Sequence, residues 1–324
     1  MHRKILVFIA LFFGTITTAE PFNFSHQCTI INNEYLLGDI VDNKTSCSSF
    51  NSKNLTIKIG DIIGEGGFST IYSASVDGIE VIIKQIELDL EQQQKSLRPN
   101  KEEALQEYLF LSKLYTNTGI SRFIVKPYAF LLSKKNAYIV MEHGGKPIAK
   151  KFKDLRSNPS LFTKVARQLF NATAALHDAN LVHMDLHPEN ILINKNNEIK
   201  IIDFGFTKKE GETIRSVAKV TYRAPEVFTV KKAYFSYDYF SVAMILYEIL
   251  TGKNMFLDID NFENLSRDHI KPDSVNYNKF RDIHQQLLDT CKNTGCDARE
   301  FALLGMLHPQ PEKRITYKNV LNQL

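Results

Sequence analysis

Three side chains with oxygen ligands stand in a fixed order in the second half of the chain. Asp185 is followed by Asn190 within one short loop, and Asp203 comes directly after an apolar run. A carboxylate can orient a hydroxyl nucleophile or accept its proton, while carboxylate and amide oxygens bind Mg²⁺ beside phosphate oxygens. The order and spacing therefore predict a site that holds a hydroxyl group and divalent metal ions next to a polyphosphate.

The neighbouring residues give this pattern a family resemblance. Residues 181–190 and 201–205 resemble the catalytic loop and Asp-Phe-Gly of eukaryotic-type protein kinases, whose pattern is His-Arg-Asp-Leu, three residues, Asn, then Asp-Phe-Gly. The resemblance implies that Asp185 accepts or orients the proton of the substrate hydroxyl. It also implies that Asn190 and Asp203 bind Mg²⁺ (or Mn²⁺), and that ATP is the phosphoryl donor.

Two positions of the catalytic loop depart from the family pattern. Met184 replaces an arginine that in many kinases binds a phosphate on the activation segment, so we expect activity without phosphorylation there. His187 replaces a lysine that helps to hold the transferred phosphoryl group, and an imidazole could do this as a hydrogen-bond donor. We expect His183 to brace the loop and not to act in catalysis.

A lysine at the end of an apolar strand extends the resemblance into the first half of the chain. A cation at such a position needs an anionic partner. The resemblance places Lys84 at the α- and β-phosphates of ATP and makes it a catalytic residue beside Asp185 and His187. Its expected partner is Glu107, and Glu103, one helical turn earlier, is the alternative.

The resemblance also outlines a nucleotide site. The glycine-rich turn at 64–69 lets backbone amides approach phosphate oxygens, and 140–144 resembles the hinge that pairs with adenine. Ile82 replaces a small alanine above the adenine ring, which puts the width of the pocket in question. The expected ATP-binding residues are Ile63, Gly64, Gly66, Ser69, Ile71, Lys84, Glu107, Met141 as the gatekeeper, Glu142, His143 and Leu192 as the pocket floor.

The segments around these motifs change character along the chain. Strand-like runs occur at 55–59, 70–74, 80–84, 127–132 and 137–142, with a helix at 101–115 whose Leu105, Leu109 and Ser112 share one face. From about residue 146 the pattern is helical, with a striped helix at 161–176 and a helix at 238–250 that is apolar nearly all round.

This order predicts an α+β fold. The resemblance implies a bilobal protein-kinase-like domain over 55–324, with its active-site cleft between the lobes. The N-lobe, about 55–142, is a small antiparallel β-sheet with one main helix, and the C-lobe, about 146–324, is larger and mainly α-helical. Three residues have architectural roles in the resemblance: Glu226 after Ala-Pro, its ion-pair partner Arg314, and the buried Asp238, which anchors the catalytic loop.

The N-terminus predicts entry into the secretory pathway. Residues 1–19 combine a basic start, a short apolar run and small residues before a cleavage site, which is typical of a signal peptide. An uncleaved anchor is the alternative, and then the membrane would be a partner. The product would lie in the ER or Golgi lumen or outside the cell.

A lead-in segment at 20–54 follows the expected signal peptide, and sequons occur at Asn23, Asn43, Asn54, Asn171 and Asn264. The four cysteines form two local pairs, Cys28 with Cys47 and Cys291 with Cys296. Their even number suggests two disulfides, although three pairings are open on sequence alone. The lead-in is therefore expected to be pinned by a disulfide and glycosylated.

Composition narrows the function classes. The chain has 324 residues, a formal net charge of +4 and no marked Lys/Arg block, so nucleic acid is not an expected partner. The leading hypothesis is a protein kinase that phosphorylates Ser or Thr of a protein substrate, with oligomeric state unassigned. A small-molecule or glycan kinase is the second hypothesis, because the loop also resembles that of antibiotic and choline-type kinases. A pseudokinase that binds nucleotide without turnover is the third.

Overall fold

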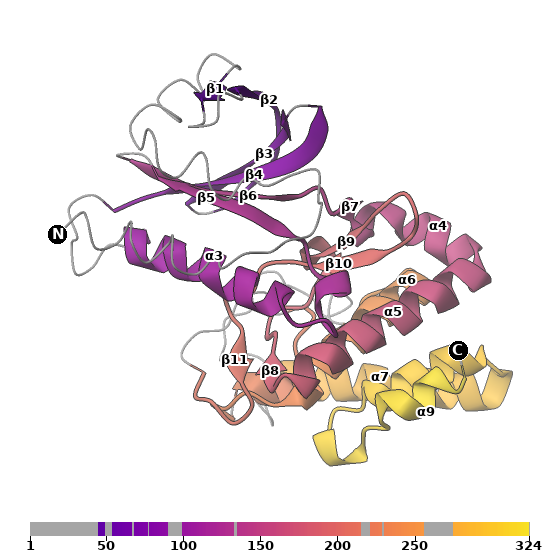
Figure 1. Cartoon of the computed structure of the whole chain (residues 1–324). Coiled ribbons are helices and arrows are strands. Elements are labelled where there is room, and N and C mark those ends of the chain that lie inside the picture. The colour runs from indigo at the N-terminus through magenta and orange to yellow at the C-terminus, as the bar shows by residue number, and fades with distance from the viewer. Residues whose placement is uncertain are drawn as a thin grey trace. The chain divides into compact units, whose positions relative to one another are not determined.

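The computed structural model describes residues 45–48, 54–66, 68–76, 78–89, 99–132, 135–214, 221–228, 230–255 and 275–323. They form two compact units, with residues up to Ser121 and Val125–His143 in the first and Arg122–Ile124 and the chain from Gly144 onward in the second (Figure 1). The predicted signal peptide, Cys28 and the sequons at Asn23, Asn43 and Asn264 lie outside the described residues.

The first unit is built on a six-stranded antiparallel sheet with the order β1-β2-β3-β4-β6-β5 (Figure 1). Its strands are β1 (Thr45–Ser48), β2 (Asn54–Glu65), β3 (Ser69–Val76), β4 (Ile79–Glu87), β5 (Pro127–Leu132) and β6 (Asn136–Glu142). The five strands expected from the sequence are present. β1 is an addition, because it lies within 20–54, where no strand was expected, and pairs with β2.

Helix α3 (Lys101–Tyr115) begins at a capping box. The Asn100 side chain accepts the Glu103 amide at 2.9 Å, and the Glu103 side chain accepts the Asn100 amide at 2.9 Å. Of the three residues expected on one face, Leu105 and Ser112 are partly buried and Leu109 is 39% exposed. The helix instead buries Ala104, Tyr108, Leu111 and Leu114. The Tyr108 ring packs against Phe130 of β5, so that the contact with the sheet decides which face turns inward.

The second unit contains most of the helices and two small sheets, with the orders β10-β9-β7 and β11-β8. Its elements are η2 (Ser121–Phe123, of which Ser121 belongs to the first unit), β7 (Lys146–Pro147), η3 (Ile148–Lys151), α4 (Phe152–Ser157), α5 (Pro159–Asp178), β8 (Leu181–Val182), η4 (Pro188–Asn190), β9 (Ile191–Ile193), β10 (Ile199–Ile201), β11 (Lys208–Lys209), η5 (Pro225–Phe228), α6 (Phe235–Thr251), α7 (Val275–Thr294), α8 (Ala298–Met306), η8 (Pro311–Lys313) and α9 (Tyr317–Leu321).

Two helices form the centre of this unit. In α5 the predicted stripe is buried at Val165, Leu169, Ala172 and Leu176, while Asn171 on the opposite face is exposed. Helix α6 is buried on nearly all sides, as its apolar sequence predicts. Within the described residues, no helix has both the length and the hydropathy needed to cross a bilayer.

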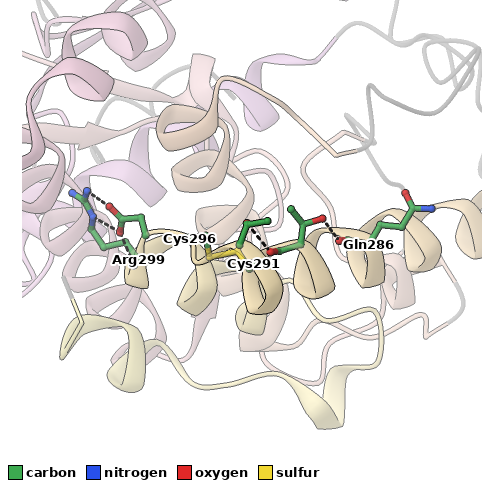
Figure 2. The surroundings of a disulfide bond; sticks show 7 residues. Gln286, Cys291, Cys296 and Arg299 are labelled. Carbon is green, nitrogen blue, oxygen red and sulfur yellow. Dashed lines mark hydrogen bonds and ion pairs between the residues drawn. A yellow bond between two sulfur atoms is a disulfide. The ribbon is translucent and has the colours of Figure 1, made fainter.

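The last part of the unit carries a disulfide. Cys291 and Cys296 are joined between the end of α7 and the start of α8, as Figure 2 shows. This is one of the two local pairs that the sequence suggested. Asp297 caps α8 through the Arg299 amide at 2.8 Å and also forms an ion pair with the Arg299 guanidinium. The bridge therefore closes a short turn that is also fixed by a helix cap.

Candidate active site

The catalytic loop is attached to the buried helix α6 through one carboxylate. Asp238 is 1% exposed and accepts the backbone amides of His183 at 2.7 Å and Met184 at 2.9 Å, one on each oxygen. The His177 ring contacts the same carboxylate at 3.0 Å. Met184 adopts a left-handed backbone with φ of 69°, which is uncommon for a residue other than glycine. The Asp238 contacts hold the loop in this shape.

His183 braces the loop from inside, as the sequence predicts. Its Nδ1 accepts the Asp185 amide at 3.3 Å, and its Nε2 lies 3.2 Å from the Ile202 carbonyl. Burial lowers the pKa of the His183 imidazole, more strongly than the nearby carboxylates raise it. A neutral ring with its proton on Nε2 can accept the Asp185 amide and donate to the Ile202 carbonyl. His183 therefore joins the loop to the strand that leads to Asp203.

The carboxylate of Asp185 is enclosed by three side chains. Arg223 Nη2 donates to Oδ1 at 2.8 Å, and Asn190 Nδ2 lies 3.3 Å from Oδ2. His187 Nε2 lies 3.7 Å from the same Oδ2. Asn190 Nδ2 also donates to the Asp185 backbone carbonyl at 3.0 Å. Asp185 is 7% exposed, and these neighbours fix the orientation of its carboxylate.

The tautomer of His187 follows from its backbone contact. His187 precedes η4, and its Nδ1 accepts the Glu189 amide at 3.3 Å. A neutral ring that accepts at Nδ1 carries its proton on Nε2, the nitrogen nearest to Asp185. The imidazole thus presents an N–H donor where the family resemblance places a lysine.

The expected metal ligands follow one another along the backbone. The Ile202 amide donates to the Asn190 carbonyl at 3.0 Å, which places Asp203 next to this loop. Asp203 has φ of 63° and an exposed carboxylate. The donor end of the Asn190 amide faces Asp185, so its oxygen end is the one that could bind a metal ion. One amide oxygen and one carboxylate fit Mg²⁺, which takes few protein ligands plus phosphate oxygens.

In the first unit, Lys84 of β4 pairs with α3. Lys84 Nζ lies 2.5 Å from Glu107 Oε1, whereas the Glu103 side chain is engaged in the capping box. Of the two alternatives for the partner of Lys84, the structure has Glu107. The pair is partly open to solvent, with the two side chains 20% and 41% exposed.

The glycine-rich turn is the tip of the β2–β3 hairpin. The Gly66 amide donates to the Ser69 carbonyl at 2.7 Å, and Gly64 pairs with Ile71 across the strands. Ile63 on β2 is 53% exposed, so it is available for contact with a ligand. Gly67 lies outside the described residues.

The hinge residues lie at the end of β6. Met141 pairs with Ile82 of β4, and the Glu142 side chain accepts the Lys126 amide at 3.0 Å. His143 follows at the end of the first unit and is partly exposed. Leu192, the expected pocket floor, belongs to the second unit, where β9 pairs with β7 and β10.

An ion pair fixes the segment that follows Asp185 and Asp203 in the chain. Arg314 donates to both oxygens of Glu226, at 2.6 and 2.8 Å, and its side chain is 7% exposed. Two parallel bonds of this kind restrict position more than a single charge contact does. The Arg314 Nε also donates to the His308 carbonyl at 2.8 Å.

Comparison with known proteins assigns this arrangement. The protein kinase domain family matches residues 57–324, most of the chain. The chain belongs to the protein kinase family. Its α+β kinase fold, predicted from the resemblance, is thereby confirmed, and the family implies ATP and a divalent metal ion.

Three curated relatives of this kinase domain are named as kinases. A serine/threonine-protein kinase ATG1c of Arabidopsis thaliana is 26% identical, over 82% of this chain and 34% of the relative. An Aurora kinase of Debaryomyces hansenii is 26% identical, over 84% and 63%. A cAMP-dependent protein kinase catalytic subunit of Dictyostelium discoideum is 30% identical, over 62% and 30%. The chain thus spans between 30% and 63% of the length of these relatives.

Sequence reasoning missed one residue of the kinase domain's site. Arg223 is 4% exposed and forms the shortest described contact to the Asp185 carboxylate. It directly precedes the Ala-Pro-Glu motif, and 38 positions separate it from Asp185. A single arginine between Tyr222 and Ala224 gives no local pattern, so only the folded segment reveals the contact.

Proposed function

We propose that this chain is an ATP-dependent protein kinase that transfers the γ-phosphoryl group to Ser or Thr hydroxyls of protein substrates. The observation that carries the proposal is the buried carboxylate of Asp185, which is surrounded by polar side chains. Asn190 contacts it, and the backbone hydrogen bond from Ile202 to Asn190 brings Asp203 next to this loop. The names of the three relatives support a Ser/Thr acceptor.

Asp185 acts on the acceptor hydroxyl. The hydroxyl oxygen attacks the γ-phosphorus of ATP, the bond to the bridging oxygen breaks, and ADP leaves with that electron pair. Asp185 orients the hydroxyl and takes its proton, while the Nε2–H of His187 donates to the transferred phosphoryl oxygens. The buried setting of Asp185 favours this role, because its carboxylate stays in one orientation before the substrate arrives.

Asn190 and Asp203 would hold Mg²⁺ or Mn²⁺, which neutralises charge on the phosphate oxygens when bound. Lys84, kept in place by Glu107, would contact the α- and β-phosphates, and the backbone amides of Gly64, Gly66 and Ser69 would bind phosphate oxygens. In the first unit, Ile63, Ile71, Met141, Glu142 and His143 would contact the adenosine, and Leu192 of the second unit stays the pocket floor that the family resemblance predicts.

A protein acceptor fits better than a small molecule. The Ala-Pro-Glu segment and the Glu226–Arg314 pair are features that small-molecule kinases generally lack, and here the pair is bidentate and largely buried. No sequence feature indicates nucleic acid as a partner.

We further propose that the kinase acts in the secretory pathway or outside the cell. The signal-like residues 1–19, the sequons and the Cys291–Cys296 bridge support an oxidising compartment. The exposed Asn171 on α5 is accessible to a glycan. Loss of apparent mass on enzymatic removal of N-glycans, abolished at this site by Asn171→Gln, would support the proposal. Full-length protein found only in the cytosol with free thiols at 291 and 296 would contradict it.

Activity is tested by expressing the chain in a secretory host and adding ATP labelled on the γ-phosphate with Mg²⁺ or Mn²⁺. The acceptors are the protein itself, casein and a panel of hydroxyl-rich small molecules. Label on protein Ser or Thr, lost in Asp185→Asn, is the expected result. Label on small molecules alone would indicate a small-molecule kinase. A thermal shift with nucleotide but no transfer would indicate a pseudokinase.

A further inference from the structure

Arg223 joins the Ala-Pro-Glu segment to the catalytic loop. Its Nη2 lies 2.8 Å from Asp185 Oδ1, and the Phe206 ring lies beneath its guanidinium at 5.6 Å. The segment that carries it is held at its other end, because Glu226 is bound by Arg314 through two hydrogen bonds. The guanidinium thus reaches the catalytic loop from a segment that is itself fixed.

The charge on Asp185 requires such a partner. The Asp185 and Arg223 side chains are 7% and 4% exposed, and a carboxylate at this depth is stabilised only by a paired cation or by hydrogen bonds. Asn190 is neutral, and His187 is charged only when its ring is protonated. In the described part of the chain, His187 and Arg223 form ion-pair contacts with Asp185. Of these two partners, Arg223 is the one that stays charged at every physiological pH.

The two carboxylate oxygens of Asp185 have different contacts, which gives them different roles. Oδ1 receives the short bond from Arg223, whereas Oδ2 has the longer contacts to Asn190 at 3.3 Å and His187 at 3.7 Å. A carboxylate anchored through one oxygen keeps the other oxygen in a fixed direction. Oδ2, which faces the Nε2–H of His187, is then the oxygen that meets the acceptor hydroxyl.

We propose that Arg223 is a positioning residue for Asp185 that holds Oδ1 so that Oδ2 can orient the acceptor hydroxyl. The inference rests on the proposed function. It gives a physical reason for the predicted activity without a phosphorylated activation segment. In many kinases an arginine of the catalytic loop binds a phosphate on the activation segment, and Met184 cannot do this. Here a cation of the Ala-Pro-Glu segment, Arg223, binds a carboxylate of the catalytic loop, so the two segments are still connected.

The test compares Arg223→Met, Arg223→Lys and Arg223→Ala in the full chain, with Arg281→Met and Arg281→Ala on the exposed surface of α7 as matched controls. Arg223→Met should lower kcat by about ten- to hundredfold with the KM for ATP nearly unchanged, because orientation of the acceptor is lost and nucleotide contacts are kept. Arg223→Lys should keep an intermediate kcat. Millimolar guanidinium should raise the kcat of Arg223→Ala and leave Arg281→Ala unchanged.

Several outcomes would overturn the inference. A kcat of Arg223→Met within about twofold of wild type would show that the contact does not position Asp185, and a higher kcat would make it inhibitory. A rise in the KM for ATP alone would assign Arg223 to nucleotide binding. If Arg223→Met does not fold, the lysine variant and the guanidinium rescue decide. No transfer by the wild-type protein would refute the proposed function and this inference together, whereas an active wild type with unchanged Arg223 variants would refute the inference alone.

Discussion

Lys84 Nζ lies 2.5 Å from Glu107 Oε1, which joins strand β4 to helix α3. Both side chains are partly exposed, at 20% and 41%, and ion pairs in such settings contribute only about 0–1 kcal/mol to stability. This pair therefore matters more for the position of the Lys84 ammonium group, and hence for phosphate binding, than for the stability of the unit.

Loss of Lys84 or its partner should accordingly reduce activity without unfolding the protein. We expect Lys84→Met to lower kcat/KM by about a hundredfold or more and Glu107→Gln by about tenfold, which corresponds to ~2.7 and ~1.4 kcal/mol. Glu103→Gln is the matched control, because glutamine can keep the capping box. Equal loss in the Glu103 and Glu107 variants, measured by γ-phosphate transfer, would argue against the assigned pair.

The attachment of the catalytic loop to Asp238 should affect both stability and turnover. Asp238→Asn puts an NH₂ group where one of two backbone amides now donates, so we expect a loss of about 2–4 kcal/mol in the free energy of unfolding. The kcat should fall as well, because His183 and Met184 lose their anchor. Asp178→Asn, at an exposed position of α5, should leave both unchanged. Urea titration and initial rates measure the two effects, and an unchanged unfolding midpoint for Asp238→Asn would refute the first.

Gly145 occupies a backbone that no other residue fits. It has φ of +113°, and a Cβ there would lie 2.2 Å from the Ile193 carbonyl oxygen. We expect Gly145→Ala to lower the free energy of unfolding by about 3 kcal/mol or more, from strain and overlap together. Gly211, with φ of +78° and open space around it, provides the control, since its alanine variant should show the strain alone, about 1 kcal/mol. Equal losses in the two variants would contradict the predicted overlap with Ile193.

Stability should fall on the acid side of neutrality. Burial lowers the pKa of the His284 imidazole, whose Nε2 donates to the Leu304 carbonyl at 2.8 Å, and lowers the pKa values of His183 and His308. The unfolded chain takes up these protons at about pH 6.5 and the folded chain only at lower pH, so stability is fully present above about 6.5 and declines below it.

His284→Gln keeps a donor for Leu304 but cannot titrate. It should therefore reduce the slope of the free energy of unfolding against pH, by at most the contribution of one proton, which is about 1.4 kcal/mol per pH unit. The measurement is the free energy of unfolding between pH 7 and 5. Gln286→Ala on the same helix changes no titrating group and should keep the wild-type slope. An identical slope for His284→Gln and wild type would exclude His284 as a source of the decline.

The short disulfide between α7 and α8 should contribute modestly. Its loop joins residues five positions apart, and closing so small a loop in the unfolded chain corresponds to about 2 kcal/mol. The Cys291→Ser/Cys296→Ser variant should lose about this much in the free energy of unfolding and keep its kcat. Under reducing conditions the wild type should match the variant. A fall in kcat with unchanged stability would instead connect the turn to catalysis.

Local patterns were sufficient wherever chain neighbours decide the structure. The bounds of α3 and β5 agree with those expected, because a capping box and an apolar run define them. The sequence places Leu105, Leu109 and Ser112 on one face of α3, but the residues that the helix buries most deeply include Tyr108. The contact of Tyr108 with Phe130 is between elements distant in sequence, and periodicity within the helix cannot reveal it.

In the site, too, sequence patterns predict the residues of local motifs but not the contacts between distant segments. Asp185, Asn190 and Asp203 follow from an ordered motif, and the resemblance favours Glu107 over Glu103. The choice is explained physically only by the capping box that engages Glu103. Arg223 was not expected beside Asp185, because that contact depends on how residues 221–228 fold back onto the loop.

The bidentate grip of Arg314 on Glu226 has a practical consequence for anyone who shortens this protein. The guanidinium that secures the Ala-Pro-Glu segment is supplied just before α9, eighty-eight positions after the carboxylate it binds. An expression clone that stopped before residue 314 would retain every residue assigned to chemistry and still lose the anchor of the segment next to them. Residue 314 is therefore the earliest end point at which we expect a shortened chain to keep this anchor.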